Sequence, residues 1–184
     1  MNIGLTQRIF SYNNIAYDCL EHGWYRLLDS HTLLPIANNE EQNFKQLVNK
    51  LDLIIFTGGD ASPRRLLTET RLLTECYKQN KPVLGVCHGA LFINQMEQGV
   101  NAECEGHHNT EHSIQMLGTE YQVNSYHSNR IVSVGSDYNI VATTDQNDIE
   151  AFEHKSRPIW GIVWHPERME KPVLPKQIES FLYG

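Results

Sequence analysis

Apolar residues occur along this chain in short runs that alternate with segments of helical periodicity. The run 83–86 lies between a proline and a glycine-containing turn, which is typical of a buried strand. Segment 63–79 begins with proline and is rich in leucine, which predicts a helix whose core stripe includes Leu66, Leu67, Leu72, Leu73 and Cys76. The same criteria predict strands at 2–6, 32–35, 53–57, 83–86, 114–116, 122–123, 140–144, 149–152 and 159–163, and helices at 15–29, 44–50, 63–79, 88–98 and 176–182.

The order of these elements predicts the fold class. Strands that are joined by helices pair in parallel, because each helical crossover returns the chain to the same end of the sheet. We therefore expect an α/β fold with a doubly wound, mainly parallel sheet and helices on both faces. Segment 99–147 is poorer in helix and predicts a small antiparallel excursion. The loops at the carboxyl ends of the parallel strands are where such sheets carry their sites.

Length and composition narrow the function classes. A chain of 184 residues can bury one core, so we expect a single domain over 1–184. The net charge of −7 disfavours nucleic acid as a partner. No apolar run reaches the roughly 20 residues that cross a bilayer, and the N-terminus lacks signal-peptide features, so we expect a cytoplasmic protein without a membrane partner. The four cysteines have no paired spacing, and we expect all of them to be thiols.

Cys87 is the side chain with the strongest indication of chemistry. It stands in a G-x-C-x-G motif at 85–89, directly after a predicted strand and before a predicted helix. This pattern is typical of a nucleophile elbow, in which a sharp turn lifts the nucleophile clear of the sheet. A Cβ at Gly85 or Gly89 would clash in such a turn. The free N–H groups of the following helix would favour a thiolate, so Cys87 is the candidate nucleophile.

A base and an orienting group for Cys87 occur late in the chain, in the W-H-P-E motif. A strand delivers His165 at its carboxyl end, and Pro166 stops the strand so that Glu167 can turn back toward the imidazole. In a triad of this order, His165 accepts and returns the proton while Glu167 fixes its tautomer. The three catalytic candidates predict acyl transfer through a thioester.

The candidate oxyanion hole comes from two turns. Strand 53–57 runs into Gly58-Gly59, and a turn of this kind can present backbone N–H groups to a developing negative charge. In an elbow, the residue after the nucleophile supplies another N–H. We therefore predict Gly59 and His88 as the two donors.

A second cluster, within 103–112, contains cysteine, histidine and glutamate and raises the question of a metal. Its spacing fits no standard zinc pattern, and the mechanism above uses no metal. We expect a solvated loop in which His112 begins a strand. Neither a metal nor another cofactor is predicted.

Taken together, these motifs resemble the class I glutamine amidotransferases, and within them the γ-glutamyl hydrolase branch. Five motifs carry the resemblance in the family's order, at 57–60, 85–89, 123–127, 149–153 and 161–167. The start I-G-L-T-Q-R, the E-A-F-E-H-K segment and the G-I-V-W-H-P-E-R segment are most similar to the γ-glutamyl-CDP-amidate hydrolases of bacterial capsule phosphoramidate synthesis. The resemblance implies a flavodoxin-like fold and cleavage of a γ-glutamyl amide, which releases glutamate. For that group, the second product would be cytidine diphosphoramidate.

The resemblance also implies a substrate pocket. The glutamyl group would contact Gly58 and the four residues of the N-S-Y-H motif, namely Asn124, Ser125, Tyr126 and His127. One position departs from the family, because Leu91 stands where many relatives carry a glutamine that holds the glutamyl group. Whether plain glutamine is a substrate therefore stays open at this point.

A nucleotide-linked substrate would need local cations in this acidic chain. The basic residues nearest the predicted site are Arg8, Arg64, Arg65 and Arg130, and arginine suits phosphate because it forms charge-assisted pairs. Two other functions remain open. One is a glutaminase subunit that delivers ammonia to a partner synthase, and the other is a binding or regulatory relative whose triad is idle.

Overall fold

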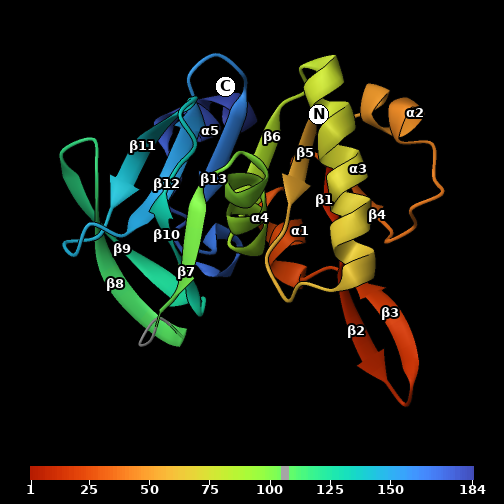
Figure 1. Ribbon diagram of the computed structural model, residues 1–184, viewed down its shortest axis with the longest axis horizontal. Helices are drawn as coiled ribbons and strands as arrows, with labels where there is room; N and C mark the ends of the chain where they lie inside the picture. Colours follow the sequence, from red (N-terminus) through yellow and green to blue (C-terminus); the bar gives the residue numbers. More distant parts are fainter. Residues whose placement is uncertain (105–107) are drawn as a thin grey trace.

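The computed structural model describes residues 1–104 and 108–184 and contains one large sheet with helices on both faces (Figure 1). Five strands form its parallel part. In spatial order these are β4 (Thr32–Ile36), β1 (Asn2–Thr6), β5 (Leu53–Phe56), β6 (Val83–Val86) and β13 (Ile159–Ile162). The predicted α/β class with a mainly parallel, doubly wound core is confirmed.

The antiparallel part of the sheet is larger than the sequence predicted. It continues from β13 through β12 (Ile149–His154), β11 (Tyr138–Thr143), β8 (His108–Met116) and β9 (Thr119–Tyr126). Two strands that we did not predict, β7 (Val100–Glu103) and β10 (Asn129–Ser133), pair with each other, and β10 also pairs with β12. Because β12 runs antiparallel to β13, its first residues lie at the carboxyl edge of the parallel strands.

Helices cover both faces and define two hydrophobic cores. Helices α2 (Phe44–Asn49), α3 (Pro63–Gln79) and α4 (His88–Met96) contribute to one core, and α1 (His22–Leu27) and α5 (Lys176–Tyr183) to the other. The predicted core stripe of α3 is partly wrong, since Leu66 and Leu67 are exposed. The buried stripe instead consists of Arg65, Thr68, Glu69, Leu72, Leu73 and Cys76, at three- and four-residue spacing. Two charged residues therefore lie on the core-facing side of α3.

The predicted helix 15–29 is wrong in its first part. Residues Ile15–Cys19 form β3, which pairs antiparallel with β2 (Arg8–Tyr12) in a hairpin that projects from the body (Figure 1). Asn13 and Asn14 both have positive φ, at 50° and 60°, as a two-residue hairpin turn requires. This Asn-Asn turn between residues of strand propensity was the signal that the helical interpretation overlooked. Helix α1 is thereby restricted to His22–Leu27.

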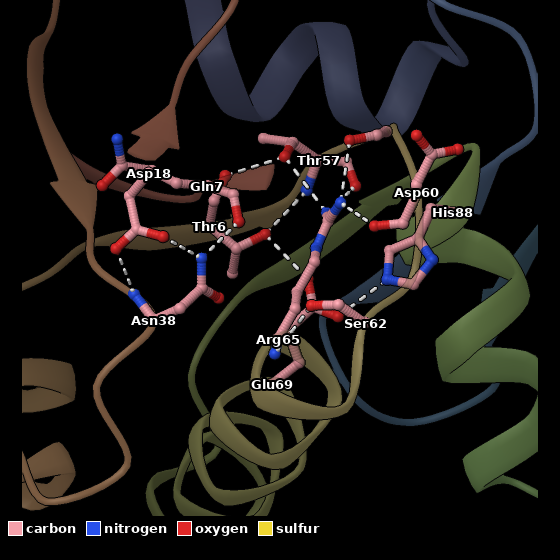
Figure 2. Close-up of polar contacts among 11 residues, drawn as sticks. Thr6, Gln7, Asp18, Asn38, Thr57, Asp60, Ser62, Arg65, Glu69 and His88 are labelled. Atoms are coloured by element: carbon pink, nitrogen blue, oxygen red, sulfur yellow. Dashed lines mark hydrogen bonds and ion pairs between the residues drawn. The ribbon is translucent and has the colours of Figure 1, made fainter. Parts of the chain in front are cut away.

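Asn38 anchors the hairpin to the body. Its side-chain amide donates to the Asp18 carboxylate at 2.6 Å and to the Gln7 carbonyl at 2.9 Å (Figure 2). Arg8, the first residue of β2, is thereby held at the carboxyl end of β1. Among the helices of residues 1–104 and 108–184, none is both long and apolar enough to span a membrane.

Candidate active site

Cys87 occupies a strained turn between β6 and α4. Its φ of 51° and ψ of −106° lie in a region that non-glycine residues rarely adopt. The Cys87 N–H donates to the Ile162 carbonyl at 2.9 Å, and its carbonyl accepts from Leu91 at 3.0 Å, so strand and helix fix the turn from both sides. The thiol thus lies at the carboxyl edge of the parallel strands and at the N-terminus of α4.

The two glycines of the motif allow α4 to approach the sheet. A Cβ built on Gly89 would lie 2.0 Å from the Phe56 carbonyl oxygen, and a Cβ on Gly85 would lie 2.7 Å from the Ala90 nitrogen. Both contacts involve backbone atoms, which cannot rotate away. The G-x-C-x-G spacing is therefore explained by the contact of α4 with β5 and β6.

His165 is paired with Glu167 in a buried site beside Cys87. The chain leaves β13, and a short 3₁₀ turn, η1 (Pro166–Arg168), brings the Glu167 Oε1 atom to 2.7 Å from His165 Nδ1. Burial by itself lowers the pKa of His165, but hydrogen bonds and charges from Cys87 and Glu167 outweigh it and raise the pKa to about 9. These contacts therefore favour the imidazolium form of His165.

Residues from β9 and η1 hold His165 in place. The Asn124 side-chain Nδ2 donates to the His165 backbone carbonyl at 2.8 Å, and the Asn124 side-chain Oδ1 accepts from the His165 backbone N–H at 2.8 Å. Tyr126 packs edge-on against the imidazole, with ring centroids 5.6 Å apart. The Arg168 guanidinium lies 4.5 Å from the centre of the Tyr126 ring and forms a two-bond pair with Glu21. Asn124 was predicted as a substrate contact, but both groups of its amide are engaged by the His165 backbone.

The Gly-Gly turn after β5 lies directly against the imidazole. A Cβ on Gly58 would be 2.3 Å from His165 Cε1, and Gly59 has a φ of 106°. The next segment starts α3, because the Ser62 hydroxyl caps the Arg65 N–H and Pro63 occupies the first turn. Gly59 and His88, the predicted oxyanion donors, therefore belong to turns that both flank the cysteine centre.

The other predicted contacts are placed less uniformly. Ser125 and His127 are buried, at the end of β9 and just beyond it. Arg8 is next to the Gly-Gly turn, since a Cβ on Gly59 would lie 3.0 Å from Arg8 Cδ. Arg64 is exposed on the first turn of α3. Arg130 forms an ion pair with Asp148.

Arg65 was predicted as a cation that could bind a substrate phosphate, and the structure contradicts this prediction. Its side chain is fully buried and donates to the carbonyls of Thr57, Gly58 and Asp60 and to Glu69 (Figure 2). Because the Arg65 guanidinium is buried and engaged in these contacts, it cannot contact a substrate. Glu69 was not predicted, although oppositely charged residues four positions apart on the buried stripe of α3 were a detectable signal.

The histidine- and cysteine-containing segment after β7 offers no metal centre among the described residues. Residues 105–107 of that segment lie outside them. Within residues 1–104 and 108–184, no group of three or more histidine, cysteine, aspartate or glutamate side chains could hold a metal ion. His112 lies inside β8, which begins at His108, so it does not begin the strand as predicted.

An elbow at the carboxyl edge of a parallel sheet, with its cysteine next to a buried histidine, defines the class of α/β enzymes that use a side-chain nucleophile. The chain belongs to the class-I glutamine amidotransferase family, whose model matches residues 17–184. The fold and family make it a glutamine amidotransferase-type hydrolase of a carbon–nitrogen bond.

Two curated relatives and one solved structure show what the chain is similar to. The chain is 30% identical over 183 residues to the γ-glutamyl-CDP-amidate hydrolase of Campylobacter jejuni, with 91% of this chain and 90% of that protein covered. It is 32% identical over 126 residues to the glutamine-hydrolysing GMP synthase subunit of Picrophilus torridus, covering 63% of this chain and 67% of the relative. The solved structure of a Thermoplasma acidophilum protein, described as a candidate GMP synthase subunit, superposes with a TM-score of 0.76 at 19% identity and covers 99% of this chain and 92% of that one.

Proposed function

We propose that this protein hydrolyses a γ-glutamyl amide through a γ-glutamyl thioester on Cys87. The observation that carries the proposal is the strained Cys87 turn beside a buried His165 that is bonded to Glu167. The thiolate attacks the amide carbonyl carbon, and the resulting oxyanion accepts hydrogen bonds from the N–H groups of Gly59 and His88. The C–N bond then breaks as the His165 imidazolium donates its proton to the leaving nitrogen.

The second half of the reaction regenerates the enzyme. Neutral His165 removes a proton from water, and the resulting hydroxide attacks the thioester carbonyl. The C–S bond breaks, glutamate leaves, and Cys87 again faces an imidazolium. Glu167 keeps the His165 ring in one orientation throughout and stabilises its positive charge.

The glutamyl end of the substrate is assigned to the β9 side of the site. Ser125, Tyr126 and His127 supply polar groups there, and Gly58 and Gly59 supply backbone on the opposite side. Asn124 is proposed to act indirectly, because its side chain fixes the His165 backbone. This assignment rests on the family resemblance and on the position of β9 next to His165.

For the leaving group, the specific proposal is γ-glutamyl-CDP-amidate, cleaved to glutamate and cytidine diphosphoramidate. The extent of the match to the Campylobacter jejuni hydrolase, nine-tenths of both chains, supports it. Arg8 and Arg64 are the proposed phosphate contacts, since both are exposed on the two segments that flank the Gly-Gly turn. Arg130 is a weaker candidate because Asp148 already neutralises it.

Arg8→Ala is expected to impair the nucleotide substrate selectively. Loss of a charge-assisted phosphate contact costs about 1.5 to 3 kcal/mol, which corresponds to a decrease of roughly 10- to 150-fold in kcat/KM. Turnover of γ-glutamyl-p-nitroanilide, which carries no phosphate, should be unchanged. Arg157→Ala, at a site where the guanidinium packs on the Tyr77 ring, is the matched control. Equal losses on both substrates would mean that Arg8 only stabilises the Gly-Gly turn.

The second candidate function is a glutaminase subunit that passes ammonia to a partner synthase. The similarity to the glutamine-hydrolysing subunit of GMP synthase favours it. Glutamate release by the purified protein from γ-glutamyl-CDP-amidate, γ-glutamyl amines and glutamine separates the two. Preference for the nucleotide substrate supports the first proposal, whereas activity on glutamine alone supports the second. A cytoplasmic location stays a prediction in both cases.

The dependence of kcat on pH is expected to report the deprotonation of His165. The proton donor to the leaving nitrogen is lost as pH rises through about 9, so kcat should fall on that alkaline side. The same group stabilises the fold fully below its ordinary pKa of 6.5, and this contribution is lost as pH rises to about 9.

Glu167→Gln should move the alkaline midpoint of kcat to lower pH, because the variant removes one of the two groups that hold the imidazolium. The measurement is kcat against pH for both proteins. His22→Gln, at an exposed position of α1, serves as control. An unchanged midpoint in Glu167→Gln would contradict the assigned pairing.

A further inference from the structure

The Arg65 side chain fixes the direction of the peptide groups in the turn after β5. Arg65 Nη2 donates to the Thr57 carbonyl at 2.6 Å, and Nη1 donates to the carbonyls of Gly58 and Asp60, each at 3.2 Å (Figure 2). In a trans peptide the C=O and the following N–H point in opposite directions. The Gly58 carbonyl faces the Arg65 guanidinium, so the Gly59 N–H must point away from that guanidinium. The buried Arg65 guanidinium thus fixes the orientation of the Gly59 N–H, which is one of the two proposed oxyanion donors.

Glu69 connects this cation to the elbow. Its Oε1 atom accepts from Arg65 Nε at 2.9 Å and from the Thr6 hydroxyl at 3.0 Å, and its Oε2 atom lies 2.8 Å from His88 Nε2 (Figure 2). His88 directly follows the nucleophile and supplies the other proposed N–H. One carboxylate therefore contacts the His88 ring directly and reaches the turn that contains Gly59 through Arg65.

Thr6 closes the arrangement on the β1 side. Its hydroxyl oxygen accepts from the Thr57 N–H at 3.1 Å, and its carbonyl accepts from the Thr57 hydroxyl at 2.7 Å. Glu69 thus holds the start of the turn through Thr6 and its continuation through Arg65. The carboxylate contacts the turn after β5 only through these intermediates.

Burial of the charged Arg65–Glu69 pair costs free energy of desolvation, which indicates that the pair has a specific role. The side chains of Arg65 and Glu69 are both 0% exposed. A buried ion pair often contributes no net stability compared with apolar residues of similar size. Burial raises the pKa of Glu69, but hydrogen bonds and charges from His88 and Arg65 together lower it below its usual range, so the carboxylate is ionised. We therefore infer that this ion pair orients the turn after β5 more than it adds to the free energy of unfolding.

We propose that Glu69 is a positioning residue of the hydrolytic reaction, which aligns the Gly59 and His88 N–H groups on the oxyanion through Arg65 and the His88 ring. This inference rests on the proposed function, because it assigns a role in the same reaction. Such alignment matters when the negative charge develops, and it adds little to binding of the neutral amide. The effect of losing Glu69 should therefore appear in kcat.

The test compares Glu69→Ala, Glu69→Gln and wild type on γ-glutamyl-p-nitroanilide. Loss of one oxyanion contact typically lowers kcat by roughly 100- to 1,000-fold, and we expect Glu69→Ala to approach the lower figure with KM nearly unchanged. Glu69→Gln should recover at least tenfold of that loss, because an amide can still accept from Arg65 and still bond the His88 ring. Glu75→Gln is the matched control, since Glu75 is a carboxylate on the same helix whose partners are Lys78 and Gln79.

Alkylation of Cys87 by iodoacetamide provides a second readout, because this reaction needs the thiolate but forms no oxyanion. Its rate should stay at the wild-type value in Glu69→Gln while kcat falls. If Glu69→Ala does not fold, His88→Ala replaces it; that variant keeps the backbone N–H, and we expect about a tenfold decrease in kcat with unchanged KM.

Three results would overturn the inference: a Glu69→Ala variant with wild-type kcat, a loss that lies entirely in KM, or an alkylation rate that falls in parallel with kcat. The last of these would mean that Glu69 merely supports the elbow. The proposed function fails separately. If wild type releases no product from any γ-glutamyl substrate, the hydrolase proposal is contradicted and the inference falls with it.

Discussion

Replacing Cys87 by alanine is expected to abolish turnover of γ-glutamyl substrates while the fold is kept. The thiolate is the group proposed to form the acyl intermediate, and without it His165 and Glu167 have no thiol to activate. Removal of a catalytic nucleophile typically leaves activity several orders of magnitude below wild type. The substitution should leave the backbone strain at this position unchanged, because the strain comes from the positive φ and does not depend on the side chain. The measurement is glutamate release together with thermal unfolding.

Cys19→Ala is the control for this experiment, since Cys19 is a free, partly exposed thiol at the end of β3. It should keep wild-type turnover. A Cys87→Ala rate above a tenth of wild type would contradict the thioester mechanism. If a cysteine-directed probe failed to label Cys87 in the wild type, the idle-triad alternative would gain support instead.

Gly89→Ala is expected to destabilise the fold strongly. The added Cβ would lie 2.0 Å from the Phe56 carbonyl oxygen and 2.6 Å from its carbon, so α4 would have to move away from β5. Overpacking against backbone costs about 3 kcal/mol at the upper end of the usual range. For a chain of this size, that corresponds to a decrease in Tm of about 6 to 12 °C. Activity should fall as well, because the same displacement separates the His88 N–H from the Gly59 N–H.

Gln95→Ala on the exposed side of α4 is the matched control for stability. It changes helix surface without touching the sheet and should leave Tm within about a degree of wild type. Thermal unfolding of both variants checks the prediction. A Gly89→Ala protein with wild-type Tm would mean that the contact of α4 with β5 is looser than the geometry requires.

The sequence alone determined the local parts of the site, because each depends on neighbours in the chain. The elbow at Cys87 was predictable from a strand, two glycines and a helix in direct succession. The contact of Glu167 with His165 was also predictable, because only Pro166 separates the two residues and Pro166 begins the η1 turn. The predicted reason was wrong in part, since β13 ends at Ile162 and Pro166 does not stop the strand. The parallel core followed from the alternation of strands and helices. The hairpin was also local, and there the helical interpretation overlooked the Asn13-Asn14 turn.

The tertiary structure decided which polar groups meet across the sheet. Asn124 and His165 are 41 residues apart, and Thr6 and Glu69 are 63 apart. No local pattern specifies such partners, because they depend on strand order and on which face of a helix is buried. The sequence therefore suggested Asn124 and Arg65 as substrate contacts. Only the packed fold shows that the first holds the His165 backbone and that the second, with Glu69, holds the turn beside it.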